Sequence, residues 1–207
     1  MSLHADALAN LRAWDAPSAP QEALRQRYVS HLEAEPTGVF KSCVPDHLTA
    51  SCVVLSDDGS SVLLTHHRKA RRWFQFGGHL EQGDATLWAA AARELREESG
   101  VPDLVPLPGL VQLSEHPVPF CAPSGDVHHL DVRFMALAPA GAVPAVSEES
   151  LDVRWWPVDG IPDPEDNLLE LIKLAQARRV GQSISSTSSS SSPGGAGSLA
   201  AADQPAR

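Results

Sequence analysis

The sequence predicts an α+β fold in which helices cover a mixed β-sheet. Segments with the alternation of strands come first, an alanine-rich helical segment follows, and further strands precede a closing amphipathic helix. With 207 residues, the chain is long enough for one domain with a full core and some flanking sequence. Its composition, 43% hydrophobic and 20% charged, is ordinary for a globular protein. We therefore expect one α+β domain.

The N-terminal part of the chain has the spacing of helices. Apolar residues recur every three or four positions over residues 3–34, with a break at Pro17 and Pro20. Residues 35–47 form a link that contains proline and glycine. We accordingly expect an N-terminal helical extension and link over residues 1–45, followed by the main domain over residues 46–181.

Strand patterns dominate the next part of the chain. Residues 49–55 and 61–67 are β-rich and are separated by a DDGS segment, which favours a hairpin. Residues 130–135 alternate between apolar and polar side chains, with Asp131 and Arg133 among the polar ones, as in a half-buried strand. The strand that contains this alternating pattern is expected to cover residues 129–137. The other expected strands cover residues 73–76, 110–115 and 151–156.

Two further helices and a tail complete the expected organisation. The alanine-rich segment 84–99 is predicted to be a helix with Asp84 as its N-cap and Gly100 just beyond its C-terminus. Residues 165–179 are predicted to be an amphipathic helix. Residues 182–207 are rich in Ser, Gly and Ala, and such a composition buries too little apolar area to offset the entropy of ordering. We expect a disordered tail without a catalytic part.

Composition also excludes several classes of function. The chain has 26 acidic and 16 basic residues and a net charge of −10, which argues against sequence-independent binding to nucleic acid. Its three cysteines, Cys43, Cys52 and Cys121, have no CxxC spacing, so neither a disulfide framework nor a zinc ribbon is indicated. The sequence has no apolar run near the roughly 20 residues that span a bilayer and no leader pattern at its start. We expect a cytoplasmic protein with no nucleic-acid or membrane partner.

Three glutamates near the end of the alanine-rich helix are candidate metal ligands. Glu94, Glu97 and Glu98 are three and four residues apart, which places them on one helix face beside the packed face. Like charges this close repel each other, and a divalent cation would turn that repulsion into attraction. Hard oxygen ligands are those that Mg²⁺ prefers. The alternative is a solvated helix surface on which Arg93 and Arg96 neutralise the glutamates.

With its flanking residues, this segment resembles the signature of the Nudix hydrolases. The signature is G-x5-E-x7-R-E-U-x-E-E-x-G-U, where U is aliphatic, and residues 77–101 read GGHLEQGDATLWAAAARELREESGV. Gly78 opens the motif, and residues 93–101 match every fixed position of its second half. The first half departs from the pattern, because Asp84 replaces the first glutamate and eight rather than seven residues precede Arg93. Either Asp84 reaches Arg93 from a changed register or Glu81 substitutes for it.

The resemblance implies a fold and an activity. The fold would be a Nudix α/β/α sandwich over roughly residues 46–180, and the reaction would be hydrolysis of a diphosphate linkage in a nucleoside diphosphate linked to another group. Mg²⁺ or Mn²⁺ would neutralise pyrophosphate oxygens and lower the pKa of the attacking water. The metal ligands implied by the resemblance are Glu94, Glu97, Glu98 and the carbonyl oxygen of Gly78.

Roles for other residues follow from the same resemblance. Arg93 would orient the glutamates without contacting the substrate. The general base remains open between a glutamate of the motif, with Glu97 as the first choice, and an acid on a later loop, Glu148 or Glu149. Two adjacent acids on a loop are more often solvated surface than catalytic residues.

Residues outside the glutamate cluster are candidates for contacting the substrate. The basic run HHRKARRW, residues 66–73, suits the steering of a phosphate substrate, with Arg72 and Lys69 as candidate contacts, although a polar hairpin loop explains it equally well. His79 follows the glycine pair and could face metal or substrate. Further histidines could form a separate transition-metal site, but none has a paired spacing on a predicted helix, which favours structural roles. They are His47, His66, His67, His116, His128 and His129.

Two alternatives to a hydrolase remain on the same fold. Isopentenyl diphosphate isomerases combine histidines and glutamates at a metal with a proton-moving cysteine, but no cysteine stands near His79 in this sequence. A non-catalytic nucleotide-binding Nudix module would usually show a degraded motif, whereas only the first acid and its spacing are altered here. The expected partner is a small nucleotide or other diphosphate, and a homodimer is possible because many Nudix proteins form one.

Overall fold

The computed structural model describes residues 1–118, 121, 126–139, 141–147 and 150–188, without the side chains of residues 182–188. Within these residues, seven strands form one mixed sheet in the order β3-β2-β1-β6-β5, with β4 paired to β1 and β7 paired to β2. The strands are β1 (Asp46–Ser56), β2 (Ser61–His67), β3 (Trp73–Phe74), β4 (Phe76–His79), β5 (Gln112–Pro117), β6 (His128–Ala138) and β7 (Ser150–Pro157). Each of the strands predicted from the sequence is present.

Strand β1 is the centre of the sheet. It runs parallel to β6 over its full length, from the pair Asp46 and His128 to the pair Ser56 and Ala138. It is antiparallel to β4 and to β2, and β2 follows it through the predicted hairpin. The prediction of a half-buried strand at residues 129–137 was wrong, since Asp131 and Arg133 are each 3% exposed. A central strand between two helical layers has no solvated face, so its polar residues lie inside the protein.

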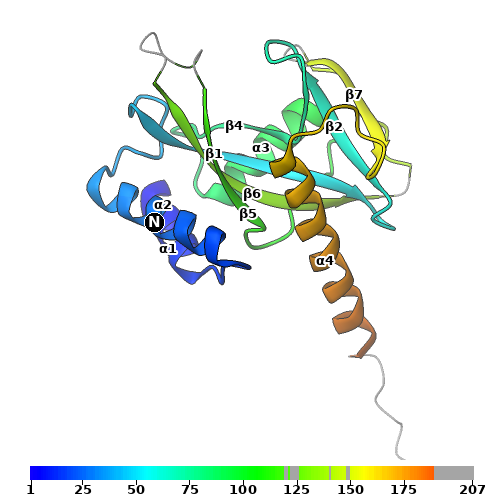
Figure 1. Ribbon diagram of the computed structural model, residues 1–207, viewed down its shortest axis with the longest axis horizontal. Helices are drawn as coiled ribbons and strands as arrows, with labels where there is room; N and C mark the ends of the chain where they lie inside the picture. The colour runs from blue at the N-terminus through cyan, green and yellow to red at the C-terminus, as the bar shows by residue number, and fades with distance from the viewer. Residues whose placement is uncertain (119–120, 122–125, 140, 148–149, 189–207) are drawn as a thin grey trace, which may run out of the picture.

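Helices cover both faces of the sheet (Figure 1). On one face, α3 (Leu87–Ser99) packs with the N-terminal helices against residues such as Leu48, Ala50 and Leu130. On the other face, α4 (Asp166–Ser188) covers residues such as Val53, Leu55 and Met135. The predicted arrangement of helices around a mixed sheet is confirmed.

The N-terminal helices belong to the same core as the sheet. They are α1 (Leu3–Ala13) and α2 (Ala19–Ala34), and Pro20 lies in the first turn of α2 rather than in the break. Leu11, Tyr28 and Leu32 are fully buried in the core that α3 shares. The Gln21 side chain donates to the Leu113 carbonyl and accepts from the Leu113 amide, so α2 satisfies the backbone of β5 as a neighbouring strand would.

Helix α3 begins later than the sequence predicts. Its N-cap is Thr86, whose hydroxyl accepts from the Ala89 amide at 3.0 Å, and not Asp84. Asp84 is instead drawn to Arg93, as described below. The C-terminal prediction is confirmed, because Gly100 adopts a left-handed conformation with φ of 67°.

Helix α4 runs further than predicted, to Ser188 rather than to residue 179. It extends away from the rest of the fold in Figure 1. The predicted disordered tail began at residue 182, but residues 182–188 belong to this helix, and the rest of the tail, residues 189–207, lies outside the described residues. In the described part of the chain, none of the helices combines the length and the apolar character required to cross a bilayer.

Candidate active site

Two glycines on β4 allow α3 to approach the sheet closely. Gly77 is paired with Ser51 of β1, and a Cβ atom at Gly77 would lie 2.3 Å from the Ser51 Cβ. A Cβ atom at Gly78 would lie 2.7 Å from the Oε1 atom of Glu94. Neither position can accept a side chain without movement of its neighbours. The pair therefore lets a carboxylate of α3 lie directly against the backbone of β4.

The three glutamates of the motif differ in exposure. Glu98 is 8% exposed, and its Oε2 accepts a hydrogen bond from the Gly77 amide at 3.0 Å. The side chain of Glu94 is 14% exposed and lies beside Gly78, one helical turn from Glu98. The side chain of Glu97 is 60% exposed. Two carboxylates thus face β4, and the third lies at the exposed side of the helix.

Arg93 connects these carboxylates to the loop that precedes α3. Its Nε and Nη2 atoms donate to the two oxygens of Asp84 at 3.2 and 2.9 Å. Its Nη1 donates to Glu94 at 2.9 Å and to Glu97 at 3.3 Å, and Nη2 also donates to the His79 carbonyl at 3.0 Å. Glu81 is more distant, at 3.9 Å. Of the two possibilities that the sequence left open, Asp84 makes the close contact with Arg93.

This network shifts the pKa values of both partners. The hydrogen bond to Asp84 is the largest of the effects that raise the pKa of Arg93. Burial alone would raise the pKa of Asp84, but hydrogen bonds from Arg93 and from the Glu81 amide outweigh burial and lower it. At neutral pH the pair is therefore fully ionised, and Asp84 fixes the guanidinium that neutralises the glutamates.

A cleft of about 550 Å³ opens beside the glycines. Glu98, Gly77 and Gly78 line it from the side of α3, and Lys41 and Lys69 add positive charge. Its remaining lining includes polar residues of β1 and β6, namely Thr49, Ser51, Asp131 and Arg133. The cleft brings carboxylates, cations and backbone amides together.

A buried network holds the polar side of this cleft. Asp131 accepts hydrogen bonds from Thr49 at 3.0 Å, from Ser51 at 2.8 Å and from the Nε of Arg133 at 2.8 Å. Arg133 also donates to Gln112 at 2.9 Å. Burial would raise the pKa of Asp131, but Arg133 and the other donors outweigh burial and lower it. The hydrogen bonds and the opposite charges compensate each other, so Asp131 and Arg133 stay ionised although they are buried.

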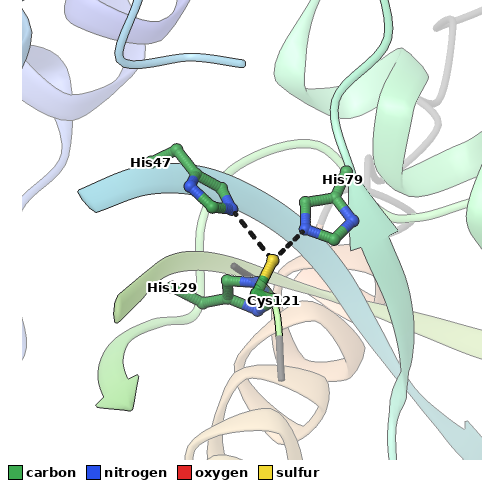
Figure 2. A group of neighbouring side chains, drawn as sticks. All are labelled: His47, His79, Cys121 and His129. Atoms are coloured by element: carbon green, nitrogen blue, oxygen red, sulfur yellow. Dashed lines mark hydrogen bonds between the residues drawn. The ribbon is translucent and has the colours of Figure 1, made fainter. Parts of the chain in front are cut away.

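A second cluster lies at the same cleft. His47, His79, His129 and Cys121 each offer one ligand atom, and these atoms lie within 4.8 Å of one another. Figure 2 shows the Cys121 sulfur between His47 and His79, with His129 beside it. Burial is the main cause that lowers the pKa of His79 to about 4 and that of His129 to about 3, so both rings are neutral at pH 7.

This cluster differs from the sequence prediction, which favoured separate structural histidines. His47 and His129 are direct partners in the parallel pairing of β1 with β6, and His79 pairs with Thr49, two residues from His47. Residues two apart on a strand share a face. Strand register, which spacing along the chain does not reveal, brings them together.

Comparison with known proteins identifies the family of the chain. A model of the NUDIX domain matches residues 45–175. The chain belongs to the Nudix family. No curated protein sequence matches it.

Solved structures of Nudix proteins share the fold. An Ap4A hydrolase from C. elegans, solved as a binary complex, is 18% identical with a TM-score of 0.55, covering 65% of this chain and 98% of its own. The E. coli dihydroneopterin triphosphate pyrophosphohydrolase is 17% identical with a TM-score of 0.52, covering 63% and 95%. The Nudix domain of Shewanella oneidensis NrtR, complexed with ADP ribose, is 23% identical with a TM-score of 0.50, covering 72% and 96%. At these identities the likeness shows the fold alone.

The candidate residues outside the Nudix motif lie in different places relative to the cleft. Lys69 and His79 line the cleft. Arg72 forms ion pairs with Glu165 at 3.0 Å and with Asp163 at 3.5 Å. Glu148 and Glu149 lie outside the described residues. Lys41, Arg133 and Cys121 were not among the predicted site residues, although the alternating polar pattern of residues 129–137 was a usable signal for Arg133.

Proposed function

We propose that this Nudix protein hydrolyses a diphosphate linkage in a nucleoside diphosphate linked to another group, in a reaction that depends on Mg²⁺ or Mn²⁺. Membership of the family assigns the chain to the hydrolases that act on diphosphate bonds. The observation that supports the proposal most is the position of two glutamates: Glu98 accepts from the Gly77 amide and lines the cleft, and Glu94 lies against Gly78 beside it.

The residues at this position fit a hard divalent cation. Glu94, Glu97 and Glu98 supply carboxylate oxygens, and Gly78 supplies a carbonyl oxygen, which are donors that Mg²⁺ and Mn²⁺ prefer. A side chain at Gly78 would occupy the space of the Glu94 carboxylate. When bound, the ion would neutralise phosphate oxygens and activate water. We assign Gly78, Glu94, Glu97 and Glu98 as its ligands.

Other residues at the cleft would bind the phosphates of the substrate, orient the glutamates or accept a proton. Lys41 and Lys69 place positive charge where the phosphates of a substrate would enter. Arg93 is a positioning residue, since its donors are engaged by Asp84, the glutamates and the His79 carbonyl. Within the motif we assign the general base to Glu97, because its side chain is more exposed to solvent than those of Glu94 and Glu98.

The substrate panel follows from the relatives and from the chemistry of the motif. The similar structures include an Ap4A hydrolase, a dihydroneopterin triphosphate pyrophosphohydrolase and a domain complexed with ADP ribose. We propose that the substrate of this chain is a small phosphoanhydride of that kind. The panel should hold dinucleotide polyphosphates, ADP-ribose, nucleoside triphosphates, oxidised nucleotides and coenzymes that contain a diphosphate.

The test is hydrolysis of this panel by the full chain with Mg²⁺ or Mn²⁺. Glu98→Gln keeps the size of the side chain and an acceptor for the Gly77 amide but removes the charge, so we expect kcat/KM to fall at least about 100-fold. Glu35→Gln, a change at an exposed position, serves as the control and should keep full activity. Equal activity of the Glu98→Gln variant would refute the role of the cluster. Tight nucleotide binding without turnover would favour a non-catalytic Nudix module.

One observation favours the isomerase alternative, namely the three histidines and Cys121 at the cleft. The Cys121 sulfur lies 3.4 Å from Nε2 of His79, so a cysteine is present in space although none is close in sequence. An assay of double-bond migration in isopentenyl diphosphate separates the two activities. We expect no isomerisation and Mg²⁺-dependent hydrolysis of at least one member of the panel.

A further inference from the structure

We propose that His47, His79, Cys121 and His129 form a second metal site, selective for Zn²⁺ or a similar transition-metal ion and separate from the glutamates of the Nudix motif. Among the described residues, this is the one group of three or more histidine, cysteine or acidic side chains whose ligand atoms all lie within 4.8 Å of one another. Figure 2 shows the four side chains converging on a common point.

Two of the distances between ligand atoms are close to those of a tetrahedral zinc centre. With bonds of about 2.0–2.1 Å to nitrogen and about 2.3 Å to sulfur, tetrahedral ligand atoms lie about 3.3–3.6 Å apart. The Cys121 sulfur lies 3.4 Å from Nε2 of His79 and 3.9 Å from Nε2 of His47. All four ligand atoms lie within 4.8 Å of one another, so the side chains must move closer together to close the ligand shell.

The histidines present the nitrogen lone pairs that a metal requires. Nδ1 of His47 lies 3.0 Å from the Cys43 carbonyl, which can only accept, so the proton is on Nδ1 and the lone pair on Nε2 faces Cys121. Such a hydrogen bond to the second ring nitrogen is typical of histidines that bind metal. Nε2 of His129 is buried and has no hydrogen-bond partner in the part of the chain that the structure describes. A metal bond would satisfy a buried nitrogen of this kind.

The scaffold holds the ligands in place in advance. His47 and His129 are partners in the pairing of β1 and β6, and His79 ends β4, which pairs with β1. The Cys121 amide donates to the Val118 carbonyl at 2.9 Å, which anchors Cys121 beside the end of β5. Three ligands thus come from the sheet, and the fourth is tied by its amide to the residue after β5, an arrangement that orders ligands before the metal binds.

The two sites offer different ligand atoms and therefore prefer different metal ions. Three imidazoles and a thiolate favour Zn²⁺ or Co²⁺, whereas the carboxylates and carbonyl near Gly78 favour Mg²⁺ or Mn²⁺. Four protein ligands leave no open position, which is the pattern of a structural centre. The ion would tie Cys121 to the sheet and fix His79, the neighbour of Gly78. This inference does not depend on the proposed hydrolysis.

The first test is titration of the full chain with Co²⁺ in saturating Mg²⁺, which keeps the hard site filled. We expect one Co²⁺ per chain, with the absorption of a tetrahedral ion and a thiolate-to-cobalt charge-transfer band that Zn²⁺ abolishes by displacement. Cys121→Ser should remove the band and weaken Zn²⁺ binding at least about tenfold. Cys43→Ser is the matched control, because it changes a partly buried cysteine yet keeps the carbonyl that accepts from His47. Glu98→Gln should keep the Co²⁺ spectrum.

A second test uses the unaltered chain. Bound Zn²⁺ should slow the alkylation of Cys121 by iodoacetamide at least about tenfold, without a change at Cys43, when the modified peptides are quantified by mass spectrometry. Equal alkylation of Cys121 with and without Zn²⁺ would overturn the proposal. A Co²⁺ spectrum without a thiolate band, or equal Zn²⁺ affinity of Cys121→Ser and Cys43→Ser, would overturn it as well.

Discussion

Arg93 offsets the repulsion between neighbouring glutamates on the folded helix. It contacts Glu94 and Glu97 through one nitrogen and Asp84 through two others. The two hydrogen bonds to Asp84 are directional, so they fix the orientation of the guanidinium beside the glutamates. Aspartate has a shorter side chain than the glutamate of the family pattern, yet it reaches Arg93 from the loop before α3. The one-residue change in spacing therefore leaves the connection between loop and helix intact.

The Asp84–Arg93 pair should contribute stability that depends on pH. Asp84 has a side chain only 7% exposed and a pKa below its ordinary value of 3.8. A carboxyl whose pKa is lower in the folded state stabilises the protein above its unfolded pKa and loses that effect as pH falls through the folded value. We expect Asp84→Asn to lower the free energy of unfolding by about 1–3 kcal/mol at pH 7. The difference from wild type should shrink below about pH 4.

Urea denaturation between pH 7 and pH 3 measures this effect. Asp103→Asn, at an exposed position, is the control and should change the free energy of unfolding by less than about 0.5 kcal/mol at either pH. A difference between wild type and Asp84→Asn that stays constant over the whole range would show that the charge of Asp84 does not matter.

At the scale of elements, the two ends of α3 were predicted with different success. The C-terminal end depends on a local property, since Gly100 can adopt the left-handed conformation that stops a helix. The N-terminal end depends on competition between Asp84 and Thr86 for the role of cap. Asp84 is a good N-cap in isolation, but its carboxylate is engaged by Arg93 nine positions later, and Thr86 caps the helix. That contact across the first turns of the helix is invisible to local cap preferences.

Gly100 should tolerate substitution poorly. Its φ is 67°, and a Cβ atom there would lie 2.5 Å from the Cβ of Ala145. Gly100→Ala should lower the free energy of unfolding by about 1–3 kcal/mol, because it adds strain in the left-handed region and a contact with Ala145. Gly83→Ala is the matched control, since nothing lies within 4 Å of the added Cβ. Thermal and urea unfolding followed by circular dichroism would compare them, and equal stability of the two variants would contradict the assignment.

At the scale of the whole molecule, the order of elements was readable from the sequence and much of the cleft was not. Alternation, turn residues and helical spacing are local, so strands, helices and the Nudix motif were identified from the chain itself. The histidine cluster depends on the parallel register of β1 and β6, which no local pattern reports. Asp131 and Arg133 looked like the solvated side of a strand, because the sequence did not show that the second face would be covered.

The folded unit includes the N-terminal helices. The NUDIX domain match begins at residue 45, but Leu11, Tyr28 and Leu32 of the helices before it are fully buried in the shared core. Gln21 also holds the amide and carbonyl of Leu113. We infer that residues 1–34 are part of the structure that makes the Nudix domain stable rather than an appendage to it.

Two truncations should therefore behave in opposite ways. Removal of residues 1–34 exposes the core surface under α1 and α2, and with roughly 2 kcal/mol for each of three large buried side chains it should lower the free energy of unfolding by more than about 5 kcal/mol. Removal of residues 189–207 should leave the unfolding midpoint and the hydrolysis of diphosphate substrates unchanged, because their composition offers little apolar area to bury. Differential scanning calorimetry and the substrate panel compare both with the full chain. A chain starting at residue 35 that unfolds at the wild-type midpoint would show that the core of the sheet is complete without the N-terminal helices.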